Sequence, residues 1–224
     1  MQVLAEKLND KGYDAKVVLF DANNMAAIAA KDGDIDGFMH NHLPWIKTFN
    51  EENNSHLIMP EPLLAYYRTA MYSTKYNSVD ELPDNAKIGY PNDPTNVEKS
   101  LQMLERIGLI KLGEKQDVFY NALDIVENPK NIELVETEIS TTARIINDVD
   151  TVICPATRIL QAGLDPNAFI VEDEAAVDQA VSLTIDEKNS DQQWVKDAME
   201  LMHSDEMRAT FDELFKGTII LYDK

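Results

Sequence analysis

Two histidines separated by one residue are the first candidates for chemistry in this chain. His40 and His42 would share one side of an extended segment, because alternate side chains of a strand point to the same face. Two imidazoles can contribute to a divalent-metal site when a third ligand comes from elsewhere in the fold. In the alternative interpretation, one histidine points into a cleft and the other packs locally. A metal-binding receptor therefore remains one hypothesis.

Arg144 is the second candidate, on a predicted short helix that precedes an apolar strand. A guanidinium group suits bidentate capture of a ligand carboxylate better than an ammonium group does. The alternative for a lone arginine is a surface ion pair. Arg68 and Arg158 are open to both interpretations.

Catalytic signatures are absent from the sequence. It contains no Gly-x-Ser-x-Gly, no Walker phosphate loop, no Gly-x-Gly-x-x-Gly and no His-Glu-x-x-His. Its single cysteine, Cys154, excludes an intrachain disulfide and a cysteine-based zinc or iron–sulfur site. We therefore predict that the protein is not an enzyme and has no cofactor.

Composition and charge narrow the class of partner. The 224 residues suffice for one large or two small domains, and 44% hydrophobic content is typical of a globular protein. Twenty basic and 40 acidic residues give a formal net charge of −20. Such a surface repels phosphate, which argues against nucleic acid and anionic headgroups as direct partners. No run of 18 apolar residues occurs, so no membrane-spanning helix is expected.

Short apolar runs alternate with amphipathic segments, and this pattern predicts an α/β fold. Buried strands are expected at 15–20, 35–39 and 151–154, and amphipathic helices at 1–11 and at 97–107, the latter with Asp93 as its cap. Two further amphipathic helices are expected to close the chain, the first capped by Ser190 and the second by Ser204. Two long extended runs, 64–72 and 180–185, bracket a self-contained block and predict two crossings between two lobes. The expected first lobe comprises 1–67 and 183–224, and the second comprises 68–182.

Several stretches together resemble a known family. They are Gly33-Asp34-Ile35-Asp36, Pro91-Asn92-Asp93-Pro94-Thr95-Asn96, Glu127-Asn128-Pro129-Lys130-Asn131, Asp148-Val149-Asp150 and Ala162-Gly163-Leu164. Their order and spacing resemble those of the methionine-binding lipoproteins of the NlpA/MetQ type, over nearly the whole chain. That family supplies the solute-binding components of ABC importers. The resemblance implies a bilobed periplasmic-binding-protein-like fold, a small-molecule solute, a permease partner, and a lipid anchor outside the cytoplasmic membrane in the full-length protein.

The resemblance also implies a ligand site in the cleft between the lobes. Its candidate residues in this chain are Asn23, His40, His42, Tyr67, Arg68, Arg144, Pro155, Thr157 and Ala180. Arg144 would bind the solute's carboxylate, the two histidines would line the cleft, and Tyr67 with Arg68 would help close it.

Four of these positions depart from the family pattern. The family has tyrosine at the position of Asn23, phenylalanine at His40, and asparagine at both Pro155 and Ala180. Loss of two polar partners for a ligand ammonium group should cost several kcal/mol. Asn23 and His40, in place of the family's aromatic rings, make the pocket more polar. The resemblance thus predicts a carboxylate-bearing solute such as methionine, another amino acid or a short peptide. A degenerate, non-transporting interaction protein is the alternative.

The start of the sequence raises one structural question. The helix predicted over 1–11 has no capping residue before it, and the family resemblance implies a signal peptide, a lipid-modified cysteine and a first strand ahead of that helix. Without that strand, two sheet edges would be left unpaired. We expect either that the first lobe closes up around 15–20 and 35–39, or that a partner's segment fills the gap in a dimer.

Overall fold

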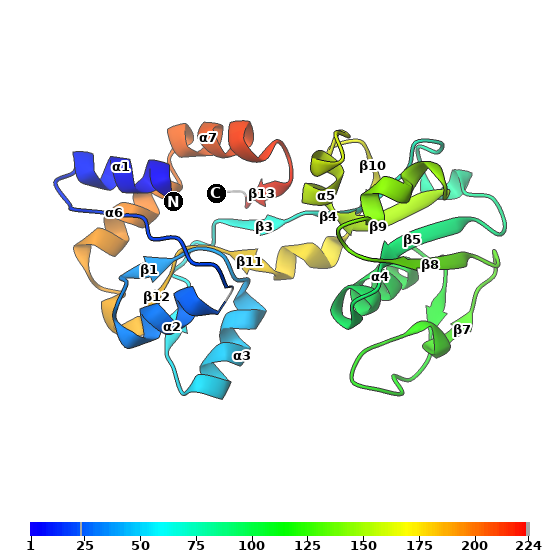
Figure 1. The fold of residues 1–224 in the computed structure, drawn as a ribbon, viewed down its shortest axis with the longest axis horizontal. Coiled ribbons are helices and arrows are strands. Elements are labelled where there is room, and N and C mark those ends of the chain that lie inside the picture. The colour runs from blue at the N-terminus through cyan, green and yellow to red at the C-terminus, as the bar shows by residue number, and fades with distance from the viewer. Residues whose placement is uncertain (23, 223–224) are drawn as a thin grey trace. The chain divides into compact units, whose positions relative to one another are not determined.

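The computed structural model describes residues 1–22 and 24–222 (Figure 1). The chain divides into two compact units. Unit 1 contains 1–67 and 177–224, and unit 2 contains 68–176. From the sequence, the chain was expected to pass back from the second unit to the first between residues 182 and 183, whereas in the structure it does so between 176 and 177. Each unit combines helices with strands, and the α/β class predicted from the alternating pattern is confirmed.

Unit 2 is organised around one five-stranded sheet with the strand order β10-β4-β9-β5-β8. Strands β5, β8 and β9 run parallel to one another, whereas β4 and β10 are antiparallel to their neighbours. The strands are β4 (Thr69–Tyr72), β5 (Lys87–Pro91), β8 (Glu133–Thr137), β9 (Thr151–Pro155) and β10 (Phe169–Glu172), with a separate hairpin-like pair, β6 (Lys111–Leu112) and β7 (Ile125–Glu127).

Helices cover this sheet because their apolar residues recur at helical spacing. Helix α4 (Pro94–Arg106) buries Val97, Leu101 and Leu104 in a core that includes Ile88 and Ile153. Asp93 caps α4 by accepting a hydrogen bond from the Asn96 backbone N–H, and Pro94 stands at its first position, where its missing N–H costs nothing. Helix α5 (Ala156–Gln161) and a 3₁₀ helix (Thr142–Asn147) close a second core cluster beside β9.

Unit 1 has shorter strands in two three-stranded sheets, ordered β1-β12-β2 and β11-β3-β13. The strands are β1 (Gly37–Phe38), β2 (Leu57–Ile58), β3 (Ala65–Tyr67), β11 (Ala180–Val181), β12 (Thr184–Asp186) and β13 (Ile219–Leu221). The helices are α1 (Gln2–Asp10), α2 (Met25–Asp32), α3 (Leu43–Asn53), α6 (Gln193–Met202) and α7 (Asp205–Phe215). Helices α1, α6 and α7 share one apolar core, and α2 with α3 share another.

The prediction of a buried strand at 15–20 is wrong. These residues run extended after α1 but join no sheet among the described residues, and Leu19 is 90% exposed. The run has strand composition, yet no neighbouring strand pairs with it. The expectation that the first lobe closes up is also wrong, because an open slot of about 720 Å³ separates this segment from β1.

Both predicted crossing strands are interrupted. The 64–72 run divides at Arg68 into β3 of unit 1 and β4 of unit 2, and the 180–185 run divides into β11 and β12, which belong to different sheets of unit 1. The predicted strand at 35–39 shortens to Gly37–Phe38. Within the described residues, no helix has the length and apolar character needed to cross a membrane.

Candidate functional site

The carboxyl ends of the parallel strands in unit 2 meet at one edge of the sheet. Strands β5, β8 and β9 end there at Pro91, Thr137 and Pro155. Antiparallel pairing sets Thr69 opposite Pro155, so that β4 begins at the same edge. Open α/β sheets bind ligands outside the carboxyl ends of their parallel strands. This edge is therefore where a ligand of unit 2 is expected.

Arg144 lies near this edge because the 3₁₀ helix begins beside the end of β8. The hydroxyl oxygens of Thr137 and Thr142 lie 2.8 Å apart, and the Thr142 hydroxyl also donates to the Glu138 carbonyl at 3.1 Å. Ala143, next to Arg144, is buried in the core that includes Cys154 and Ala156. The backbone is thus fixed on both sides of Arg144 while its side chain is exposed.

The guanidinium group of Arg144 differs from those of the other four arginines. Arg68 and Arg106 form ion pairs with Glu172 and Asp173, while Arg158 and Arg208 donate to Gln161 and to the Tyr222 carbonyl. Arg144 has no such side-chain partner among the residues that the structure describes. Its five donors remain available for an external anion.

Arg68 lies at the same edge, but its guanidinium group already bonds other residues of unit 2. Its Nε donates to Glu172 Oε2 at 3.1 Å, and its Nη1 donates to Asn167 Oδ1 at 2.8 Å. The guanidinium carbon also lies 4.7 Å from the centre of the Phe169 ring. Arg68 is therefore a fixed part of unit 2. From the sequence, Arg68 could either contact a ligand or form an ion pair. In the structure it forms an ion pair with Glu172.

Pro155 and Thr157 flank the junction between β9 and α5. Pro155 ends the strand and precedes the helix, and Thr157 is half-buried in the first turn. The Ala156 backbone N–H donates to the Arg68 carbonyl at 2.9 Å, which ties this junction to the start of β4. Unit 2 therefore brings Arg144, Pro155, Thr157 and Arg68 to one region of its sheet.

The remaining described candidates belong to unit 1. His42 caps α3, with its Nδ1 accepting a hydrogen bond from the Trp45 backbone N–H at 3.1 Å, and His40 is exposed just after β1. Tyr67 ends β3, whereas Ala180 is only 2% exposed and pairs with Tyr66. Asn23 lies outside the described residues.

The metal hypothesis finds no third ligand in the described part of the chain. No group of three histidine, cysteine, aspartate or glutamate side chains there could hold a metal ion. The Nδ1 atom of His42 is already the acceptor for the helix cap, so it is not available to coordinate a metal ion.

Two polar residues at the edge of unit 2 were not among the site candidates: Asn92, and Tyr90, which is buried in the core as its sequence environment indicates. The Asn92 backbone N–H donates to the Thr137 carbonyl at 2.8 Å, and its side chain reaches Glu138 at 3.4 Å. Tyr90 donates its hydroxyl proton to Glu136 at 3.0 Å, and burial together with that carboxylate raises the tyrosine pKa. Their position directly after, or at the end of, apolar strands was the available signal.

Comparison with known proteins agrees with this architecture. A D-methionine-binding lipoprotein MetQ of Escherichia coli O157:H7 is 33% identical over 222 residues, which are 96% of this chain and 81% of that protein. A solved periplasmic substrate-binding protein of an ABC transporter from Coxiella burnetii has a TM-score of 0.73, with 26% identity over 99% of this chain and 94% of that one. A nutrient-binding protein from Burkholderia cenocepacia bound to methionine has a TM-score of 0.72, with 27% identity over 99% and 92%.

These similarities identify first the class of protein and then its family. The fold is that of transporter solute-binding proteins, which are not enzymes. The match to the NlpA lipoprotein family extends over residues 1–221, and this chain belongs to that family. The resemblance identified from the Pro91–Asn96 and Glu127–Asn131 stretches is thereby confirmed.

Proposed function

We propose that this protein is the solute-binding component of an ABC importer and that it binds an amino acid or another small carboxylate-bearing solute. The relatives named above include methionine-binding proteins, which supports an amino acid as the solute. Its macromolecular partner would be the importer's permease, and a lipid anchor would hold the full-length protein outside the cytoplasmic membrane, because its family consists of lipoproteins.

The observation that carries this proposal is the guanidinium group of Arg144, which has no side-chain partner in residues 1–22 and 24–222. It lies on a 3₁₀ helix near the carboxyl edge of a parallel sheet, where ligands of α/β folds bind. An exposed arginine fixed by a buried backbone loses little conformational freedom when it binds, and it can grip a carboxylate with two parallel hydrogen bonds. The whole chain has a net charge of −20, so most of its surface repels a solute carboxylate.

The side chains at other candidate positions argue for a solute class wider than methionine. Pro155 and Ala180 have no polar side-chain atoms, so neither can hydrogen-bond a ligand ammonium group through its side chain. His40 offers a polar, exposed imidazole. A carboxylate is thus the part of the solute for which this chain offers a dedicated partner.

Isothermal titration against the standard amino acids and short methionine-containing peptides tests the proposal. For any ligand that binds in this titration, Arg144→Gln should weaken binding by about tenfold to a hundredfold. The reason is that a charge-assisted hydrogen bond contributes about 1.5–3 kcal/mol. Arg158→Gln is the matched control, since that side chain already bonds Gln161, and it should leave Kd unchanged.

Failure of every carboxylate ligand to bind a folded sample would contradict the proposal. If a wider metabolite library also produced no thermal shift, the alternative of a non-transporting interaction protein would be favoured. Equal Kd values for wild type and Arg144→Gln would remove Arg144 from the site while leaving solute binding in place.

A further inference from the structure

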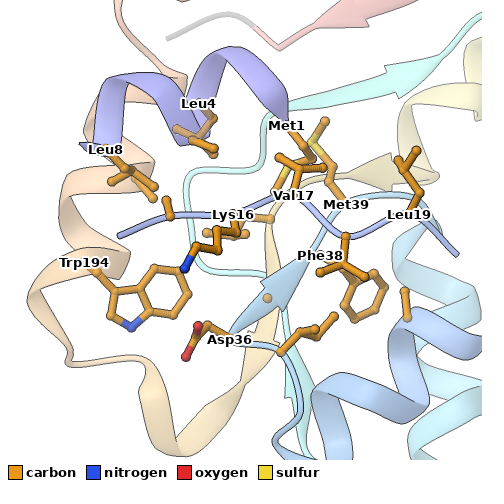
Figure 2. A pocket seen from close by; sticks show the side chains of 18 of the residues that line it. Met1, Leu4, Leu8, Lys16, Val17, Leu19, Asp36, Phe38, Met39 and Trp194 are labelled. Carbon is orange, nitrogen blue, oxygen red and sulfur yellow. The ribbon is translucent and has the colours of Figure 1, made fainter. Parts of the chain in front are cut away.

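Unit 2 exposes its large apolar side chains in one short segment, 113–126. The exposed ones among 68–176 all lie within nine residues of this segment: Val118, Phe119, Leu123 and Val126. The exposed apolar residues of unit 1 are spread over several elements, and two of them, Val17 and Leu19, line the slot beside β1 (Figure 2). Exposed apolar side chains gathered in one place are typical of an interaction surface.

The backbone of this segment is fixed by one buried carboxylate. The segment leads from β6 into β7 and contains a short 3₁₀ helix, Ala122–Asp124 (Figure 1). Asp124 is 2% exposed, and its carboxylate accepts hydrogen bonds from the backbone N–H groups of Gln116 at 3.3 Å and of Asn121 at 2.9 Å. The Gly113 backbone N–H also donates to the Asp124 carbonyl at 2.8 Å. Asp124 thereby holds both halves of the loop against the start of β7.

Side-chain packing attaches the same segment to the core of unit 2. Tyr120 and Ile125 are partly buried and pack against the core to which α4 contributes. The Nζ atom of Lys115 lies 4.9 Å from the centre of the Tyr120 ring and pairs with Glu98 of α4. Successive side chains of a strand point to opposite faces, so Ile125 packs inward while Val126 is exposed. The core takes Tyr120 and Ile125 and leaves the four exposed apolar side chains in solvent.

Charge in and around the segment indicates what kind of partner fits it. Both lysines nearby are already paired with carboxylates: Lys111 with Glu127, and Lys115 with Glu98. Glu114 and Asp117 form no ion pair with any residue in 1–22 or 24–222. The uncompensated charge beside the exposed apolar residues is therefore negative. It complements a partner surface that has lysine or arginine next to apolar side chains.

The same charge disfavours two other occupants. A second copy of this chain has a net charge of −20 and the same two free carboxylates, so that like charges would face each other. A bilayer with anionic headgroups would also be repelled. A basic and apolar polypeptide is the occupant that suits both the apolar side chains and the carboxylates.

We propose that the segment 113–126 is a docking surface for the importer's permease and that it binds an apolar permease segment flanked by lysine or arginine. This inference rests on the proposed function, which supplies the permease as the macromolecular partner. Leu123, at 91% exposure, is the most exposed apolar contact, and Glu114 with Asp117 pairs with the permease's cations. Because Asp124 already fixes the backbone, docking requires little ordering of the loop.

Stimulation of ATP hydrolysis measures the docking. The probe is the importer's permease with its ATPase, reconstituted in phosphatidylcholine nanodiscs, to which the solute-loaded full chain is added. Leu123→Asp should raise the concentration for half-maximal stimulation by about tenfold or more, because docking would bury a carboxylate among apolar side chains. Leu123→Met keeps an apolar side chain and should behave like wild type. Leu214→Asp makes the same charge change at a leucine of α7 that is 61% exposed, and it should have no effect.

A charge reversal tests the electrostatic part of the proposal. Asp117→Lys should slow association with the immobilised nanodiscs at low salt, and the difference from wild type should disappear at high salt, because charges at the rim of an interface act mainly on the association rate. Asp80→Lys is the matched control: Asp80 is an exposed carboxylate of unit 2 that forms no ion pair with the described residues. It should leave the association rate close to that of wild type.

Isothermal titration of the same variants with the solute separates this inference from the proposed function. Each variant should bind the solute with the wild-type Kd, because none of the substituted residues is a candidate for the solute site. Unchanged half-maximal stimulation for Leu123→Asp, or equal weakening by Leu214→Asp, would overturn the docking surface and leave the proposed function in place. Absence of solute binding by the wild-type chain would contradict the proposed function and, with it, this inference.

Two further results would overturn the proposal by identifying another occupant. Binding of the wild-type chain to phosphatidylcholine vesicles that Leu123→Asp abolishes would show that the segment contacts a lipid surface. A wild-type dimer in light scattering that Leu123→Asp converts to a monomer would show that a second copy covers the segment.

Discussion

Two apolar runs of similar composition have opposite environments in the two units. In unit 2, Val152, Ile153 and Cys154 are at most 1% exposed within β9. In unit 1, Val17, Val18 and Leu19 are 42%, 58% and 90% exposed and belong to no strand. The difference between them is not hydrophobicity.

Neighbouring strands account for the difference. Strand β9 lies between β4 and β5, with Ala70 opposite Cys154 and Gly89 opposite Val152, so its main chain is paired on both edges. The main chain of segment 16–20 has no hydrogen bond to any described residue, because the slot lies between it and β1. A strand-like sequence therefore becomes a buried strand only where the fold supplies both its flanks.

The largest expected contrast is the effect of side-chain truncation. Ile153→Ala should lower the free energy of unfolding by about 2–5 kcal/mol, because it leaves a cavity in the core of unit 2. Leu19→Ala should change it by no more than about 0.5 kcal/mol, since the leucine is exposed. Denaturant unfolding followed by circular dichroism measures both. A large cost for Leu19→Ala would mean that the slot is filled in solution.

An intermediate effect on the free energy of unfolding is expected from alkaline pH, and it arises from buried groups of unit 2. Burial raises the pKa of the Cys154 thiol from 9.0 to about 12, although Arg158 acts in the opposite direction, and burial also raises the pKa of Tyr72. Above pH 9.0 the unfolded thiol ionises while the folded thiol does not. The cysteine's contribution to stability is therefore complete below 9.0 and is lost at about 1.4 kcal/mol per pH unit up to about 12.

The free energy of unfolding as a function of pH tests this for wild type and Cys154→Ala. The variant should show a shallower decline above pH 9.0. Alkylation of the native protein should be slow for the same reason, because the reactive thiolate is disfavoured in the fold. Identical slopes for the two proteins would assign the alkaline sensitivity to other groups.

The smallest effect should be the same in both units, because it is local. Asp93 and Ser204 cap α4 and α7 by accepting hydrogen bonds from Asn96 and Met207 backbone N–H groups, each at 3.2 Å. Replacement of either by alanine should cost about 1 kcal/mol of stability. Asp93→Asn and Ser204→Thr are controls that keep an accepting oxygen. If capping in unit 1 has no measurable cost, then α7 is already frayed in solution.

Local features were the most predictable from the sequence. The caps expected at Asp93 and Ser204, the helical stripe of Val97, Leu101 and Leu104, and the β9 strand are all present. The cap expected at Ser190 is not, because α6 begins after Gln192. The strands at 15–20 and 64–72 did not, because pairing and interruption depend on residues far away in the chain. Among the site candidates, the exposed Arg144 and the ion-paired Arg68 look alike in sequence, and the difference between them lies in Glu172, more than 100 positions from Arg68.

The sequence by itself determined the α/β class, the acidic surface, the absence of catalytic motifs and the family, because composition, periodicity and short motifs are properties of contiguous residues. Only the tertiary structure decided which arginine has no side-chain partner in the described part of the chain and which apolar run remains exposed. Both depend on partners brought together by the fold, and a charge or a strand edge is satisfied or left open according to those partners.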